Sequence, residues 1–89
     1  MVSRDITIIN KLGLHARAAA RFVSLASSFE SNIHVTKDGK TVNGKSIMGV
    51  MMLAASQNST ITITAEGDDE SSALKSMVKL VNDRFGEDE

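Results

Sequence analysis

Residues 59–65 read Ser59-Thr60-Ile61-Thr62-Ile63-Thr64-Ala65, an alternation of polar and apolar side chains with a period of two. Such alternation is typical of a β-strand that buries one face and exposes the other. With Ile61 and Ile63 directed inward, the sheet needs a layer of helices on only one of its faces. This segment therefore predicts an antiparallel sheet with one covered face.

Three more strands are expected on the N-terminal side of this one. Residues 4–9 and 32–37 also alternate, with Ile6 and Ile8 directed inward in the first and Ile33 and Val35 in the second. Asp38-Gly39 is a strong signal for a two-residue hairpin turn, so residues 40–43 are expected to pair with the strand before them.

Helical spacing of apolar residues predicts three helices, over residues 16–29, 47–55 and 68–85. Acidic residues open the last helix at its positive end, and Gly86 is placed to terminate it. The element order is then β-α-β-β-α-β-α. We expect an α+β fold, an open-faced two-layer sandwich in which three helices cover a four-stranded antiparallel sheet, with one domain over residues 1–89.

The composition argues against several classes of protein. The formal net charge is −1, there is no Trp or Tyr and there are three Phe, so a basic face and most stacking platforms for nucleic acid are missing. Without cysteine there is no disulfide, and a small domain without such links suits the reducing cytoplasm. No apolar run approaches the roughly 20 residues of a membrane span. We expect a cytoplasmic protein without a nucleic-acid or membrane partner.

The start of the first helix breaks two rules of helix capping. His15 stands at the expected N-cap, where Ser, Thr, Asp or Asn is preferred, and Arg17 stands in a first turn that has no acid. Free N–H groups, the helix dipole and a guanidinium group thus meet at a point suited to phosphate, an anion that we expect to come from outside the chain. The imidazole is a nucleophile that is largely neutral near pH 7.

Plainer interpretations of these residues stay open. A single histidine before a helix is usually a solvated polar residue, and an arginine in the first turn is a tolerable misfit. No acid–base dyad or triad is in reach, so a hydrolase is not indicated. His34 lies on the outward phase of its strand, and two isolated histidines without cysteine or paired carboxylates predict no metal site.

Two motifs resemble the HPr family of bacterial phosphocarriers. Lys11-Leu12-Gly13-Leu14-His15-Ala16-Arg17 resembles the active-site segment of that family. Asn43-Gly44-Lys45-Ser46-Ile47-Met48-Gly49-Val50-Met51-Met52-Leu53 is similar to its regulatory-serine and second-helix segment. The order of elements is similar along essentially the whole chain. The acidic ending and the long, Met-rich second helix look more like the nitrogen-branch form, NPr, than the sugar-branch form.

The resemblance implies that His15 accepts a phosphoryl group on Nδ1 from a phosphorylated enzyme I protein and passes it to an enzyme IIA-type protein. Arg17 would stabilise the charge, and the helix start at Ala16 and Ala18 would hold the phosphate. Such a protein is a carrier rather than an enzyme and needs no cofactor. The family commonly has proline where this chain has Ala18. Because alanine is a good helix former, this departure puts the transfer rate rather than the activity in doubt.

The segment 47–55 contains no charged residue. We expect Val50, Leu53 and Ala54 to face the core, which leaves the other side exposed as an adaptable docking surface. A helix buried all round is the alternative. The residues expected on the docking surface are Ile47, Met48 and Met51 with Ala20 and Arg21 of the first helix.

Ser46 has two interpretations. As an N-cap it stabilises the following helix by about 1 kcal/mol. As in some HPr branches, it would also be a regulatory phosphorylation site whose phosphate adds negative charge to the docking surface. The rival to a phosphoryl carrier is a regulatory binding module that uses the same surface without passing phosphate on. In either case we expect a monomer.

Overall fold

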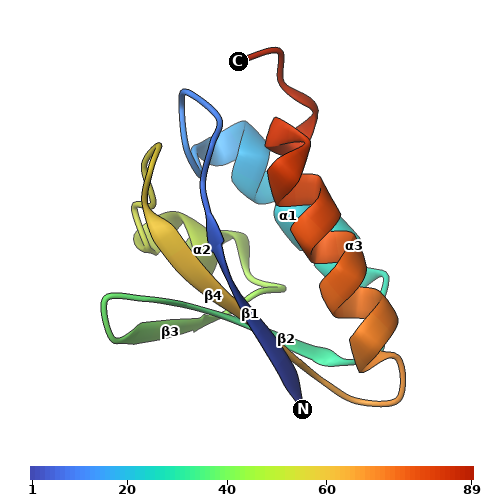
Figure 1. Cartoon of the computed structure of the whole chain (residues 1–89). Helices are drawn as coiled ribbons and strands as arrows, with labels where there is room; N and C mark the ends of the chain where they lie inside the picture. Colours follow the sequence, from blue (N-terminus) through green and yellow to red (C-terminus); the bar gives the residue numbers. More distant parts are fainter.

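The computed structural model describes all residues from Met1 to Glu89. Four strands form one antiparallel sheet, and three helices cover one of its faces (Figure 1). This is the open-faced α+β sandwich that the element order predicts. In chain order the elements are β1 (Val2–Thr7), α1 (Ala16–Ser27), β2 (Asn32–Lys37), β3 (Lys40–Asn43), α2 (Ile47–Met52), β4 (Thr60–Glu66), α3 (Glu70–Asn82) and a 3₁₀ turn, η1 (Arg84–Gly86).

The strand order in the sheet is β1-β4-β2-β3, so the last strand of the sequence lies between β1 and β2. Its Ile63 is aligned with Arg4 on β1 and with Val35 on β2. Asp38 and Gly39 connect β2 to β3 with φ values of 52° and 80°, which confirms the predicted hairpin turn. The two edges of the sheet are β1 and β3.

One hydrophobic core of 20 buried residues lies between the sheet and the helices. β4 buries Ile61 and Ile63 as its alternation predicts. Phe22 of α1 and Phe85 of η1 are both fully buried. Because η1 also contacts α1, the burial of Phe85 fixes the end of the chain beside the first helix.

The last helix ends earlier than its apolar spacing predicts. α3 stops at Asn82 because Arg84 and Phe85 adopt left-handed φ values of 56° and 54°, which an α-helix cannot contain. Phe85 therefore enters the core from a turn rather than from a helix. Gly86, with a φ of 79°, ends this turn instead of ending α3.

The second helix is also shorter than expected, with six residues. Leu53 is buried as predicted, but Ala54 has a φ of 50° and is exposed, so its expected place on the core face is wrong. Left-handed backbone at this position ends the helix and turns the chain. Immediately after it, the carbonyl of Ala55 accepts a hydrogen bond from the Leu14 amide at 2.8 Å, which ties the loop before α1 to the end of α2.

Smaller differences concern the ends of elements. β1 covers Val2–Thr7 rather than residues 4–9, because this is the range over which it pairs with β4. α1 ends at Ser27, two residues early, and the Ser28 hydroxyl donates to the Leu25 carbonyl at 2.6 Å. None of the helices combines the length and the apolar character that crossing a membrane requires.

Candidate functional site

His15 occupies the N-cap of α1, as its position in the sequence predicts. Its backbone is extended (φ −76°, ψ −178°), and its ring Nδ1 accepts a hydrogen bond from the Arg17 amide at 3.3 Å. Gly13, two residues before His15, has a φ of 66°, and a Cβ at this position would overlap with the carbonyl of Ala55. Only glycine permits this close approach, so the loop holds His15 in a defined place at the helix start.

The other ring nitrogen of His15 faces a carboxylate from the far end of the chain. His15 Nε2 and Glu87 Oε2 lie 2.6 Å apart, and Glu87 Oε1 accepts a hydrogen bond from Asn10 Nδ2 at 2.8 Å. Asn10 is fully buried and also donates to the Gly13 carbonyl at 2.9 Å. The C-terminal segment thus brings a carboxylate to the His15 ring and to Asn10, while the first turn of α1 itself contains no acid.

The carboxyl group of Glu87 is held in its ionised form. Burial alone would raise its pKa, but hydrogen bonds from His15 and Asn10, together with electrostatic attraction to His15 and Arg21, outweigh burial and place the pKa below its ordinary value. An ionised carboxylate only accepts hydrogen bonds, so Nε2 of His15 carries a hydrogen. Nδ1 accepts from the Arg17 amide, so the two contacts together place the hydrogen on Nε2 and the lone pair on Nδ1.

A hollow of about 470 Å³ lies between the start of α1 and the C-terminal segment. Three cationic side chains line it together with three acids of the C-terminal segment, which partly neutralise them, and His15 itself is not among the lining residues. Its lining residues are Lys11, Leu12, Arg17, Arg21, Gly86, Glu87, Asp88 and Glu89.

The remaining predicted residues of α1 have different environments. Ala16, Arg17 and Ala20 are exposed. Ala18 is fully buried, so only its backbone can meet an anion. Arg21 donates from Nη1 to the carbonyl of Phe85 and so helps to hold the C-terminal segment in place.

α2 exposes an apolar surface, and the alternative of a helix buried all round is wrong. The exposed fractions are 45% for Ile47, 71% for Met48 and 40% for Met51, as predicted, and Met52 adds 63%. We call these four residues the α2 patch. α2 packs against α1, and the hydrogen bond from the Leu14 amide to the Ala55 carbonyl ties the chain just after α2 to the loop before α1, so α2 lies near the start of α1 (Figure 1).

Ser46 caps α2, as predicted. Its Oγ accepts a hydrogen bond from the Gly49 amide at 3.1 Å, and the residue is half-buried. A phosphate on this oxygen would stand at the positive end of the helix and directly beside the α2 patch.

Sequence reasoning missed Asn10, Glu87 and Met52. Glu87 stands 72 positions from His15, and its only local signal is the acidic run that follows Gly86. Asn10 is a buried polar residue in a turn, where a polar side chain is ordinarily expected on the surface.

The second histidine stays apart from this site. His34 is exposed on β2, where it is aligned with Asn43 and Thr64. No group of three or more His, Asp or Glu side chains is arranged to hold a metal ion.

The chain is similar in sequence and in structure to known proteins. The profile of a family described as "PTS HPr component phosphorylation site" matches residues 2–83. The chain is 52% identical to the phosphocarrier protein HPr of Cupriavidus necator over 89 residues, all of both chains. It superposes on the crystal structure of HPr-C-His from Thermoanaerobacter tengcongensis with a TM-score of 0.96 and 53% identity, covering 100% of each chain. An HPr dimer from the same organism matches with a TM-score of 0.79 and 54% identity, covering 98% of this chain and 100% of that one.

Proposed function

Because the chain belongs to the HPr family of phosphocarrier proteins, we propose that it carries a phosphoryl group on Nδ1 of His15. The observation that carries this proposal is the pair of contacts at the imidazole ring. Glu87 accepts from Nε2–H, and the Nδ1 lone pair stands at the start of α1 beside Arg17. A nitrogen lone pair is the group that attacks phosphorus, and the helix start with its arginine stabilises the charge of the transferred group.

In the loading step, Nδ1 of His15 gives up the hydrogen bond from the Arg17 amide and attacks the phosphorus of a phosphohistidine on an enzyme I-type donor. The donor's N–P bond breaks as the new one forms, and the donor imidazole leaves with the electron pair of its bond. His15 loses no proton, because Nε2 keeps its hydrogen. The ring gains positive charge, which the Glu87 carboxylate at 2.6 Å offsets, while Arg17 is placed to meet the phosphoryl oxygens.

The same chemistry unloads the carrier. A histidine of an enzyme IIA-type protein attacks the phosphorus, and the electron pair of the N–P bond returns to Nδ1 of His15. The protein is thus a carrier between two partners, with no cofactor, and not an enzyme acting alone. Donor and acceptor must approach His15 from the same side, so we propose that both dock in turn on the α2 patch and on Ala20 of α1.

Three finer points belong to this proposal. The acidic ending Glu87-Asp88-Glu89 favours the nitrogen-regulatory branch. The second expected sign of that branch, a long second helix, is missing, because α2 has only six residues. Faster loading of a nitrogen-type IIA than of a sugar-type IIA supports this branch, and the reverse order overturns it.

We propose that the carrier works as a monomer in the cytoplasm, since a second copy on the α2 patch would block its partners. Phosphorylation of Ser46 would weaken docking by adding charge beside the patch.

The test of the carrier function is phosphoryl transfer with purified partners. Phosphoenolpyruvate and an enzyme I protein should give one phosphoryl adduct, seen by intact mass, that is labile in acid and stable in base. His15→Ala should give none. An adduct of equal yield on His15→Ala would overturn the proposal.

The rival function, a binding module that docks partners without passing phosphate on, is favoured by the exposed α2 patch alone. Labelled protein mixed with an IIA-type acceptor separates the two functions. Transfer of label to the acceptor supports the carrier, and label that never leaves His15 supports the binding module.

A further inference from the structure

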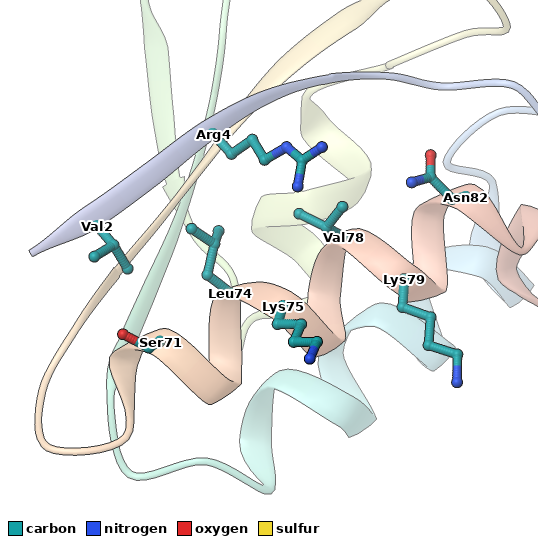
Figure 2. Close-up of a pocket in the computed structure, with 8 residues that line it drawn as sticks. All are labelled: Val2, Arg4, Ser71, Leu74, Lys75, Val78, Lys79 and Asn82. Atoms are coloured by element: carbon teal, nitrogen blue, oxygen red, sulfur yellow. The ribbon is translucent and has the colours of Figure 1, made fainter.

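A second hollow lies between the edge strand β1 and α3 (Figure 2). It has a volume of about 510 Å³ and shares no residue with the hollow between the start of α1 and the C-terminal segment. We call it the β1–α3 groove. Its lining residues are Val2, Arg4, Ser71, Leu74, Lys75, Val78, Lys79 and Asn82.

The wall formed by α3 is a single stripe, because its lining residues recur at helical spacings of three and four. Leu74 and Val78 point toward β1 and make an apolar floor, whereas the ammonium groups of Lys75 and Lys79 point away from β1, on the outer side of α3 (Figure 2). Leu74 is only half-buried, so this floor is incompletely covered. The groove thus has an apolar base and a cationic rim.

Arg4 stands where the strand pattern calls for an apolar residue. Its neighbour across the sheet, Ile63, is fully buried, and Ile6 on the same face of β1 is also buried. Arg4 itself is exposed and points into the space between β1 and α3 (Figure 2). An inward charge on an edge strand discourages non-specific pairing, which accounts for Arg4 but not for the two lysines of α3 that flank the same groove.

The three cations of the groove have no anionic partner in the protein. The four ion pairs of the structure include none of Arg4, Lys75 and Lys79. Glu70, at the start of α3, is already paired with the N-terminal amine at 2.9 Å. Three positive charges without an ion-pair partner thus surround one apolar groove, although the net charge of the chain is −1. A ligand complementary to this groove is anionic and has an apolar part.

β1 offers the backbone for such a ligand. It pairs with β4 on one side only, so its other edge is free to accept one more strand. Asp5 lies on the opposite face of β1 from Arg4 and would repel acids on that face. A membrane surface would meet this carboxylate and the overall negative charge, and it would leave the free strand edge unused.

We propose that the β1–α3 groove binds an extended segment of a partner protein, which adds to the free edge of β1 and presents acidic and apolar side chains on the same, inward face. The apolar side chain packs on Leu74 and Val78. The acids meet Arg4 and the lysines of α3.

The test uses the full ¹⁵N-labelled chain and two capped seven-residue peptides of the same composition. The first has glutamate at its second and sixth places, valine at its fourth and threonine elsewhere, so that acids and valine share one face. The second has valine moved to the third place, on the opposite face. We expect the first peptide to shift the amide signals of β1 and α3, and to bind at least tenfold more tightly than the second.

Matched variants locate the binding. Lys75→Gln/Lys79→Gln should weaken the first peptide at least tenfold, and Lys37→Gln/Lys40→Gln, on the β2–β3 hairpin, should leave it within about twofold. Phosphoryl uptake by His15 should be unchanged in both, which separates this proposal from the carrier function. Equal affinity for the two peptides, or shifts centred on Arg17 and Arg21, would overturn it. The proposal would also be overturned if Lys75→Gln/Lys79→Gln left peptide binding unchanged and weakened only binding to phosphatidylglycerol vesicles or self-association.

Discussion

The contact between His15 and Glu87 determines which imidazole nitrogen is available for reaction. At 2.6 Å, with side-chain exposures of 28% and 14%, the pair is partly shielded from water, so its attraction is stronger than that of an exposed pair. Asn10 donates to the second oxygen of the carboxylate and thereby fixes its orientation. The ring is thus oriented by a carboxylate that contacts Nε2, the nitrogen other than the one proposed to carry the phosphoryl group.

Replacing Glu87 by Gln removes the charge that offsets the developing positive ring while keeping the shape of the side chain. We expect phosphoryl uptake from enzyme I to slow about tenfold, the effect of roughly 1.4 kcal/mol in the transition state. Asp68→Asn, at an exposed acid before α3 that has no ion pair and does not line the hollow, is the control and should keep the wild-type rate. Rapid-quench measurement of labelled protein gives both rates. A Glu87→Gln rate equal to that of Asp68→Asn would contradict the role of the carboxylate.

At the scale of single elements, α2 depends on its N-cap and on its contact with α1 more than on the helix propensity of its own residues. It has six residues, buries only Val50 and relies on the Ser46 hydroxyl to satisfy the Gly49 amide. A helix of this length is unstable alone, so the cap and the contact with α1 maintain it. The α2 patch can remain apolar and exposed because the rest of the fold supplies this support.

Loss of the cap should therefore be measurable. Ser46→Ala leaves the Gly49 amide without its acceptor and should lower the free energy of unfolding by about 1 kcal/mol in urea titrations. Ser46→Asp keeps an acceptor at the N-cap and should retain most of the stability while weakening donor docking through its charge. If Ser46→Ala and wild type unfold at the same urea concentration, the hydroxyl is not a stabilising cap.

At the scale of the whole molecule, three carboxylates with lowered pKa values join parts of the chain that are distant in sequence. The pKa of Asp69 is lowered first by the Ser31 hydroxyl and then by backbone amides. That of Glu70 is lowered by the N-terminal amine and the Gly67 amide. Glu87 joins the C-terminal segment to His15 and Asn10. Together they connect α3 to the loop before β2 and both chain ends to the body of the protein.

These three groups make stability depend on acidity. Because each folded pKa lies below its unfolded value, the stabilisation is fully present above the unfolded values and is lost as the pH falls through the folded ones. We expect the free energy of unfolding to change little between pH 7 and about 5 and to fall steadily below that. Urea unfolding at several pH values should show a smaller acid-induced loss for Asp69→Asn, whereas Asp88→Asn should follow wild type. An unchanged acid-induced loss in Asp69→Asn would refute its part in this dependence.

Most of the fold could be predicted because its signals are local. The Thr–Ile alternation of β4, the Asp38-Gly39 turn and the caps at His15 and Ser46 each depend on residues within a few positions of one another. The ends of α2 and α3 were predicted less well. Ala54 and Phe85 are residues that a helix ordinarily accepts. Phe85 has a positive φ value and is fully buried, whereas Ala54 is exposed and lies between the buried Leu53 and Ala55.

The sequence by itself determined the elements, their exposed and buried faces, and the histidine at the start of α1 with its neighbouring arginine. The tertiary structure alone decided that Glu87 meets Nε2 of that histidine, and that β1 and α3 enclose a groove with three unpaired cations. The physical reason is the separation along the sequence of the residues that interact. Periodicity, capping and turn preferences are set by short stretches of backbone. The His15–Glu87 contact joins residues 72 positions apart, and it exists because burying Phe85 brings the end of the chain back to α1.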